Sequence, residues 1–332
     1  MKVLVTGAAG YVGCVLVPKL LKAGHSVVAH DIMYYGSHGL KPQAGLTIVS
    51  ADLRDIPAFS EAVRGCEAVI HLACISNDPS FELDPALGKS INFDCFEPMV
   101  RASQAAGVKR FIYASSSSVY GVSESPNVDE THALKPLTDY SKFKALCEEV
   151  LARLKKPGFT TCVIRPATVC GYSPRTRLDL AVNILTNLAV NKRRITVFGG
   201  SQKRPNIHIS DISDLYVELL ALPAEKIDGK IWNAGYQNHT VADLARMVKA
   251  VVESEFPDKA PIEIVTSPTD DLRSYHVSSE KIGRDIGFKP KHTVEDAIRD
   301  LCKAFKAGNL PDSLTDPRYF NVQTMKAAAP TV

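Results

Sequence analysis

The first thirteen residues restrict the fold more than any other segment of the chain. Residues 3–6 form a short apolar run typical of a buried parallel strand, and residues 11–23 predict a helix. Between a strand and a helix, glycines allow a tight turn, close backbone approach to a pyrophosphate and close helix–sheet packing. The helix N-terminus also offers free N–H groups to phosphate, so the segment predicts a dinucleotide site. The residues expected to contact the dinucleotide are Gly7, Gly10, Tyr11, Val12 and Gly13.

A carboxylate stands at the end of the second predicted strand, residues 27–31. At the position of Asp31, a carboxylate accepts hydrogen bonds from the adenosine ribose hydroxyls and repels a 2′-phosphate, and no arginine directly follows it. The sequence therefore favours NAD(H) over NADP(H), although a helix or turn cap is an alternative role for Asp31. Asp52, after the third predicted strand, is a candidate partner for the adenine amino group or, equally, a strand-end cap.

Strand-like and helix-like segments alternate through the first half of the chain. Regular alternation indicates βαβ units, and hence an α/β fold with a Rossmann-type, doubly wound parallel sheet. The predicted strands are residues 3–6, 27–31, 46–50, 68–72, 110–114 and 160–165, and the predicted helices are residues 11–23, 55–64, 84–106 and 138–154.

After residue 165 the alternation gives way to irregular segments rich in glycine, proline and arginine. We therefore expect an NAD-binding Rossmann domain over residues 1–165. Residues 166–310 are expected to form mainly a smaller C-terminal α/β substrate lobe that returns some elements to the first domain. Residues 311–332 are expected to be a loosely ordered tail. The helices predicted in this half are residues 178–191, 210–221, 240–254 and 293–306.

The composition excludes several classes of protein. The 332 residues are 45% hydrophobic and 23% charged, which is ordinary for a globular protein, and a net charge of +3 is too balanced for a dedicated nucleic-acid binder. No apolar run is long enough to predict a membrane span. The eight cysteines form no C-x-x-C pair, and no signal-peptide pattern precedes the glycine turn. We therefore expect reduced, buried thiols, a cytoplasmic location and no metal site.

Two further motifs carry chemistry. Tyr140 and Lys144 are four residues apart in the predicted helix 138–154, so they project from the same face. A nearby ammonium lowers the pKa of a tyrosine, which makes Tyr140 a candidate general base. The serine run at residues 115–118 directly follows the fifth predicted strand, where side chains face the ligand crevice of an open α/β sheet. Each motif alone is common, but together with the glycine turn they predict an active site.

In this order the motifs resemble the extended short-chain dehydrogenase/reductase family, the nucleotide-sugar epimerases and dehydratases, of which UDP-galactose 4-epimerase is the familiar member. The resemblance covers about residues 1–307 and rests on the T-G-x-x-G-x-x-G turn, Asp31, His71-Leu72-Ala73, the serine run and Y-x-x-x-K. It implies NAD as the cofactor and a nucleotide-diphosphate sugar as the substrate.

The resemblance also implies a homodimer, formed through the predicted helices 84–106 and 138–154. The apolar residues of these helices fit either such an interface or the core of one chain. They include Phe96, Met99, Val100 and Phe143.

The resemblance assigns roles to single residues. Ser116 matches the catalytic hydroxyl that acts beside Tyr140 and Lys144 and contacts the substrate. A guanidinium suits a pyrophosphate, so Arg204 and Arg273 are expected to meet the sugar nucleotide unless they form surface ion pairs. The further cofactor contacts that it implies are Leu53, Leu72, Ala73, Asn92 and Pro166, and the further substrate contacts are Ser117 and Asn183.

Two departures from the family pattern bear on the reaction. Ser117 and Ser118 stand where the 4,6-dehydratase branch has an acidic pair, so elimination of water lacks its acid and base. Residues 76–80 differ from the best-known 4-epimerases and border the expected sugar pocket.

These features predict an NAD-dependent nucleotide-sugar epimerase that acts through a transient keto-sugar, with Tyr140 as the base and Ser116 as its hydrogen-bond partner. The alternative is an NAD(P)-dependent nucleotide-keto-sugar reductase or a sugar dehydrogenase, which needs the same residues. A non-catalytic dinucleotide-binding regulator would keep the glycine turn without needing Tyr140 or Lys144.

Overall fold

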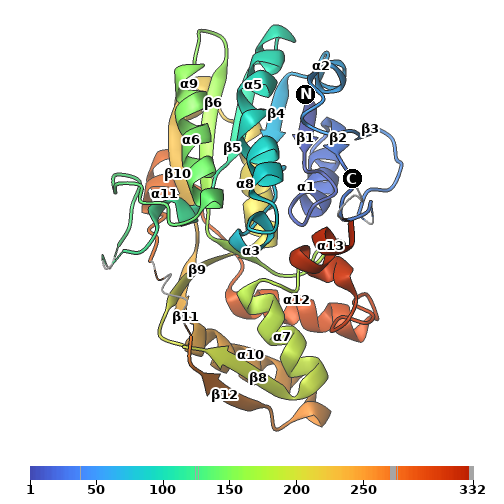
Figure 1. Cartoon of the computed structure of the whole chain (residues 1–332), viewed down its shortest axis with the longest axis vertical. Helices are drawn as coiled ribbons and strands as arrows, with labels where there is room; N and C mark the ends of the chain where they lie inside the picture. Colours follow the sequence, from blue (N-terminus) through green and yellow to red (C-terminus); the bar gives the residue numbers. More distant parts are fainter. Residues whose placement is uncertain (38, 124, 126, 270–273, 275, 329–332) are drawn as a thin grey trace.

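A seven-stranded parallel sheet forms the centre of the molecule (Figure 1). The computed structural model describes residues 1–37, 39–123, 125, 127–269, 274 and 276–328. The strand order is β10-β6-β5-β4-β1-β2-β3, and it reverses between β1 and β4, the point at which open α/β sheets bind ligands. The strands are β1 (Lys2–Thr6), β2 (Ser26–Asp31), β3 (Leu46–Ser50), β4 (Ala68–His71), β5 (Arg110–Ala114), β6 (Thr160–Pro166) and β10 (Lys230–Ala234).

The six strands predicted in the first half are confirmed to within one residue at each end. The seventh strand, β10, has no counterpart among the predictions. It comes from the later half of the chain and pairs in parallel with β6, with Trp232 opposite Ile164. Its five residues, KIWNA, alternate too briefly between polar and apolar side chains to predict a strand.

Helices cover both faces of this sheet, which confirms the doubly wound architecture. Leu16 of α1 and Leu215 of α8 belong to one buried cluster, whereas Phe59 of α2, Val100 of α5 and Leu151 of α6 belong to the cluster on the opposite face. The helices are α1 (Gly13–Lys22), α2 (Ile56–Val63), α5 (Phe96–Ala105), α6 (Asp139–Arg153) and α8 (Ile209–Ala221).

The prediction of a single helix over residues 84–106 is wrong in one respect, because the structure divides this segment into two helices. α4 (Pro85–Lys89) is followed by a π-helical turn (Ser90–Asp94) and then by α5. The break lies just before Pro98, whose nitrogen has no hydrogen to donate to the carbonyl four residues earlier.

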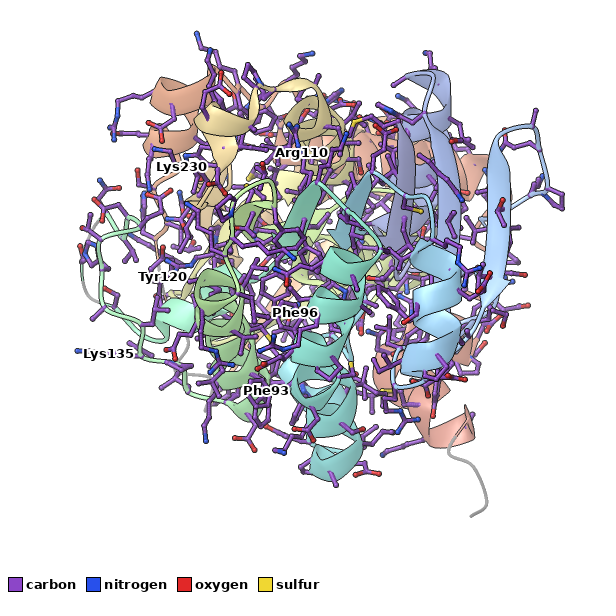
Figure 2. The ribbon with its side chains drawn as sticks, turned by 90° about the horizontal axis from the view of Figure 1, so that it is seen from above. Phe93, Phe96, Arg110, Tyr120, Lys135 and Lys230 are labelled. Carbon is purple, nitrogen blue, oxygen red and sulfur yellow. The ribbon has the colours of Figure 1, made fainter. Side chains whose placement is uncertain are left out.

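Two alternatives, a dimer interface and the core of one chain, were open for four apolar residues of α5 and α6. The structure places these residues in the core of the single chain. Phe96 on α5 (Figure 2) is 1% exposed. The others are buried as well, namely Met99, Val100 and Phe143.

A smaller lobe is built from the later part of the chain (Figure 1). Three helices pack together there and bury Leu185, Val248 and Ile298 in one cluster. The strands form a parallel pair and a three-stranded sheet of order β11-β9-β7. The elements are β7 (Thr168–Cys170), α7 (Ala181–Lys192), β8 (Arg194–Phe198), β9 (Lys203–His208), β11 (Gln237–Thr240), α10 (Val241–Glu255), β12 (Glu263–Ser267) and α12 (Val294–Lys306).

The C-terminal segment is ordered up to residue 328, so the expectation of a loose tail is wrong there. Leu310 and Tyr319 pack with Leu178 and Leu301 in a buried cluster, and the backbone of Leu178 hydrogen-bonds the Tyr319 carbonyl at 2.9 Å. α13 (Asn321–Ala328) then returns toward the first domain (Figure 1). Within the described ranges, no helix is both long and apolar enough to cross a bilayer.

A buried ion pair joins the elements around the serine run. Arg165 on β6 donates to Glu148 on α6 from Nε at 3.0 Å and from Nη2 at 2.6 Å. Its Nη1 donates to the hydroxyl of Tyr120 at 2.8 Å, and Ser115 Oγ donates to Glu148. Burial disfavours the charged guanidinium, but the bonds to Glu148 outweigh it and raise the pKa of Arg165. The pair therefore fixes α6 against the ends of β5 and β6.

We predict that His71 makes the fold sensitive to acid. Its Nδ1 hydrogen-bonds Thr6 Oγ1 at 2.7 Å, and burial lowers its pKa from 6.5 to about 3. The unfolded chain binds this proton below about pH 6.5 and the folded chain does not, so stability falls as pH drops from there toward 3, by up to about 1.4 kcal/mol per pH unit. The free energy of unfolding, measured with urea at several pH values between 7 and 4, is expected to change less steeply with pH for His71→Asn than for the wild type. Equal slopes would contradict the prediction.

We predict that Glu148→Gln lowers the free energy of unfolding by about 3–5 kcal/mol, because it leaves the buried Arg165 guanidinium without its counter-charge. Glu149→Gln changes the exposed neighbour on the same helix and is expected to stay within about 0.5 kcal/mol of the wild type. Denaturant unfolding of both variants measures the difference. Similar values for the two would show that the ion pair does not support the fold.

Candidate active site

The glycine turn brings backbone against backbone, as its sequence predicts. Gly7 has a φ of 69°, and a Cβ there would lie 2.8 Å from the Ala73 backbone. A Cβ at Gly13 would lie 2.4 Å from the carbonyl oxygen of Gly7. Only glycine fits at these two positions, and the resulting turn exposes its backbone to the adjoining cavity in the way that a dinucleotide pyrophosphate requires.

Asp31 is held at the edge of this turn by two backbone N–H groups. Ala9 N donates to its Oδ2 at 3.0 Å and Met33 N donates to its Oδ1 at 2.7 Å. Burial raises the pKa of this carboxyl, and the two backbone bonds oppose the rise. The carboxylate thus caps the turn and also lines the cavity, where its remaining acceptor positions suit ribose hydroxyls.

One cavity of about 370 Å³ joins the glycine turn, the serine run and the Tyr140 helix. It lies at the carboxyl ends of the central strands, next to the point where the strand order reverses. The residues predicted from sequence that line it are Gly7, Gly10, Tyr11, Val12, Gly13, Asp31, Asp52, Leu53, Leu72, Ala73, Ser116, Ser117, Tyr140, Lys144 and Pro166.

Lys144 and Tyr140 lie on the same face of α6, as their spacing predicts. Lys144 is 4% exposed, and its Nζ donates to the Ala114 carbonyl at 2.7 Å and lies 5.9 Å from the centre of the Tyr140 ring. Ser116, two residues after the end of β5, accepts a hydrogen bond from Ser118 N at 3.1 Å. The carbonyl of Ala114 therefore fixes the ammonium at the floor of the cavity beside the two hydroxyls.

The expected direction of the Tyr140 pKa shift is wrong. Burial raises the pKa well above 10, and Cys74 and Asp78 add to the rise. Arg177 and a hydrogen bond with Ser116 oppose it, whereas Lys144 is not among the main causes. Desolvation outweighs the nearby positive charge because the hydroxyl lies in the wall of a narrow cavity.

Two asparagines predicted near the ligands form hydrogen bonds within the protein. Asn92 accepts from Ile75 N at 2.8 Å and donates to Ile75 O at 3.0 Å, so it lies behind the cavity wall and not on it. Asn183 is fully buried; it accepts from Gly171 N at 3.0 Å and donates to Tyr11 Oη at 3.0 Å and to Arg177 O at 2.8 Å. Its amide is used within the fold and does not line the cavity, and a substrate contact at Asn183 stays a prediction.

A second cleft of about 480 Å³ adjoins the first between the two lobes. It shares Asp78 and Ser118 with the first cavity, and Arg204 of β9 lines its far side. The structure thus brings Arg204 to the region where a sugar nucleotide was expected. Arg273 lies outside the described residues.

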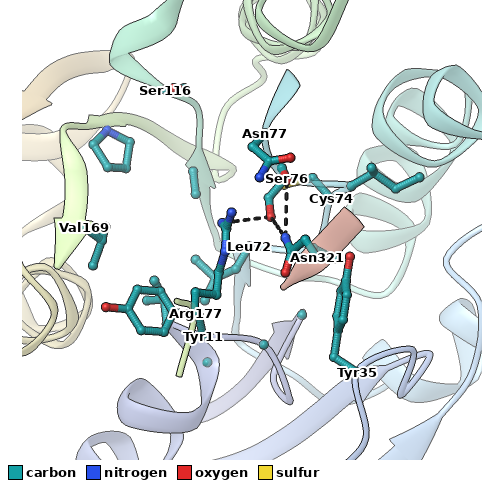
Figure 3. Close-up of a pocket in the computed structure, with 18 of the residues that line it drawn as sticks. Tyr11, Tyr35, Leu72, Cys74, Ser76, Asn77, Ser116, Val169, Arg177 and Asn321 are labelled. Atoms are coloured by element: carbon teal, nitrogen blue, oxygen red, sulfur yellow. Dashed lines mark hydrogen bonds between the residues drawn. The ribbon is translucent and has the colours of Figure 1, made fainter. Parts of the chain in front are cut away.

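Sequence reasoning missed a polar cluster at the centre of the cavity (Figure 3). Arg177, 8% exposed, pairs with Asp179 at 2.9 Å and donates to Ser76 Oγ at 3.1 Å. Asn321 of α13 donates to the same Oγ at 2.9 Å and accepts from Arg175. The repeated arginines in the segment after β7 were a detectable signal, but nothing local linked Asn321 to them.

Two other arginines contact residues that line the cavity, namely Tyr35 and Asp52. Arg175 stacks 4.1 Å from the centre of the Tyr35 ring, and burial together with Arg177 lowers its pKa to about 10. Arg54 forms a bidentate bond with Asp52 and lowers the pKa of that carboxyl. The Asp52 carboxylate therefore already has a cationic partner.

Comparison with known proteins relates most of the chain to the family that the sequence motifs resemble. The family model described as "NAD dependent epimerase/dehydratase family" matches residues 3–235. The UDP-glucose 4-epimerase of Lactobacillus helveticus is 26% identical over 92% of this chain and 98% of its own. A dihydroflavonol 4-reductase of Callistephus chinensis is 28% identical over 95% of this chain and 89% of its own.

A solved structure extends the likeness to three dimensions. The UDP-glucose 4-epimerase of Thermus thermophilus, in complex with NAD, has a TM-score of 0.80 and 25% identity, over 92% of this chain and 99% of that chain. The glycine turn, Asp31 and the cavity beside them fit this cofactor. The chain therefore belongs to the NAD-dependent epimerase/dehydratase family, and it is an NAD-dependent enzyme.

Proposed function

We propose that the protein is a nucleotide-sugar epimerase that acts through a transient keto-sugar. The observation that carries the proposal is the convergence of Ser116, Tyr140 and Lys144 on the cavity that the glycine turn also lines. The second cleft opens from this cavity toward Arg204, whose guanidinium suits the pyrophosphate of a nucleotide-diphosphate sugar.

Each side chain has a role that its position supports. Tyr140 takes the proton of a sugar hydroxyl, and Ser116 hydrogen-bonds the same oxygen. Lys144, fixed by the Ala114 carbonyl, holds the cofactor ribose and keeps a positive charge near the phenol. When bound, NAD⁺ supplies the hydride acceptor and a cationic ring that favours the phenolate. Return of the hydride to the other face of the keto-sugar completes an epimerisation with no net oxidation.

A net redox reaction is the second candidate, because a keto-sugar reductase or a sugar dehydrogenase needs the same three residues. One relative is named a dihydroflavonol 4-reductase, which makes this candidate specific. Asp31 argues against a reductase that uses NADPH. The 4,6-dehydratase reaction is disfavoured by Ser117 and Ser118. Tyr140 and Lys144 are both present and converge, which disfavours a non-catalytic regulator.

A homodimer formed through α5 and α6 and a cytoplasmic location also remain proposals. The eight cysteines are all unpaired, and seven of them are buried, which suits a reducing compartment.

We predict that Gly13→Ala weakens NAD⁺ binding, because the added Cβ would meet the Gly7 and Ala8 carbonyl oxygens at 2.4 and 2.5 Å. Overpacking of this kind costs about 1–3 kcal/mol, or roughly five- to 150-fold in affinity. Gly283→Ala is the matched control, since the nearest atom to its Cβ would lie at 3.6 Å. Calorimetric titration with NAD⁺ measures both variants. Equal affinities would remove the glycine turn from the cofactor site.

We predict that the enzyme, supplied with NAD⁺ and a panel of UDP-, GDP-, CDP- and dTDP-hexoses, converts one of them to its epimer without net change in NADH absorbance. Tyr140→Phe is expected to lower this turnover by about 10²- to 10⁴-fold while NAD⁺ affinity is kept. Product chromatography and absorbance at 340 nm measure the two outcomes. A stoichiometric change in NADH would establish the redox alternative, and unchanged turnover in Tyr140→Phe would remove Tyr140 from the mechanism.

A further inference from the structure

A continuous row of hydroxyls runs from the catalytic serine to a carboxylate. Ser116 Oγ and Ser118 Oγ are 2.9 Å apart, and Ser118 Oγ and Ser141 Oγ are also 2.9 Å apart. Thr138 Oγ1 lies 3.1 Å from Ser141 Oγ and donates to Asp78 Oδ1 at 2.6 Å. Every step lies within hydrogen-bond distance, and the row crosses from the end of β5 to the start of α6 and then to the segment after β4.

Each hydroxyl carries a single hydrogen, so the row has two consistent orientations. When Asp78 is ionised, Thr138 donates to its carboxylate. Ser141 then donates to Thr138, Ser118 donates to Ser141, and Ser116 donates to Ser118. When Asp78 is protonated, the same hydrogens point the other way and Ser118 donates to Ser116. The change from one orientation to the other carries one proton between Asp78 and the Ser116 end of the row.

We infer that Ser118, Ser141 and Thr138 form a proton relay that links Tyr140, through Ser116, to Asp78. This inference rests on the proposed function, because it supplies the proton balance of the same base. As Tyr140 gives its proton to Ser116 Oγ, each hydroxyl passes its own proton to the next. One O–H bond breaks at Tyr140 and one forms at Asp78, so negative charge moves from the carboxylate to the phenolate and no electrons are exchanged.

The position of Asp78 suits the end of a relay. The residue is half-buried and lines both the cofactor cavity and the second cleft, so the relay reaches a region that opens to solvent. Tyr140 itself is partly buried and lines the cavity, where burial disfavours its phenolate. The relay gives the Tyr140 proton a route from the cavity wall to this region.

The relay also joins the two departures from the family pattern. Ser118 occupies a position that is acidic in the dehydratase branch, and Asp78 lies in the unusual segment of residues 76–80. The carboxylate therefore stands at the far end of a hydroxyl row instead of directly after the catalytic serine.

Helix capping does not account for the whole row. Thr138 is the N-cap of α6 and accepts from Ser141 N at 3.3 Å. That bond uses the backbone N–H of Ser141, and the Ser141 hydroxyl takes no part in the cap. Ser141 is 3% exposed. The Ser141 hydroxyl is the central link between the two halves of the row.

Ser141→Ala and Asp78→Asn test the relay on the full-length enzyme with NAD⁺ and the hexose nucleotide of the panel that turns over fastest. Each variant is expected to lower kcat by about 10- to 100-fold and to leave KM within about twofold. The wild type should show a solvent deuterium isotope effect with a curved dependence on deuterium fraction, and Ser141→Ala should make it linear. Ser103→Ala, a buried serine on α5, and Asp139→Asn, an exposed carboxylate on α6, are controls expected to match the wild type.

The outcomes separate the relay from the function on which it rests. No turnover by the wild type on any panel member would overturn the proposed function, and the relay with it. If Tyr140→Phe abolishes turnover while Ser141→Ala and Asp78→Asn retain it, the relay alone is overturned. A raised KM with unchanged kcat would make these residues substrate contacts and also overturn it. Thermal unfolding midpoints of the variants, together with recovery of kcat in Thr138→Ser but not in Thr138→Val, exclude loss of folding as the cause.

Discussion

The buried pair between Arg165 and Glu148 holds the active-site elements at fixed positions. Glu148 lies one helical turn beyond Lys144 on α6, so the pair fixes the helix that carries both the amine and the phenol. The same carboxylate accepts from Ser115, the first residue of the serine run. A buried charge tolerates little displacement from its partner, because separation would leave it uncompensated. The positions of Tyr140 and Lys144 therefore depend on a pair, Arg165 and Glu148, that does not itself line the cavity.

Much of the fold and of the cofactor site was predictable because its signals are local. The glycine turn is specified by steric demands within the first thirteen residues and their neighbour Ala73, where a Cβ has no room. Buried parallel strands appear in the sequence as short apolar runs, which located six of the seven strands of the main sheet. Tyr140 and Lys144 share one helix, so their spacing alone places them on one face.

The parts that could not be predicted depend on contacts between distant segments. Asn183 has the residue type of a ligand contact, but its amide is used by Tyr11 and Gly171, which are brought to it only by the fold. Asn321 reaches the cavity from the C-terminal helix and meets Ser76, which is 245 residues away in the chain. The Tyr140 pKa follows the depth of burial more than the charge on the same helix, and burial is a property of the assembled cavity.

In the proposed epimerisation, hydride leaves a sugar carbon and returns to the same carbon without exchange with solvent. The most direct measurement uses a nucleotide hexose deuterated at the carbon that the enzyme inverts, with NAD⁺ present and the product examined by mass spectrometry and NMR. We expect the epimer to retain the deuterium at that carbon. Deuterium lost to water, or found in free NADH, would contradict it.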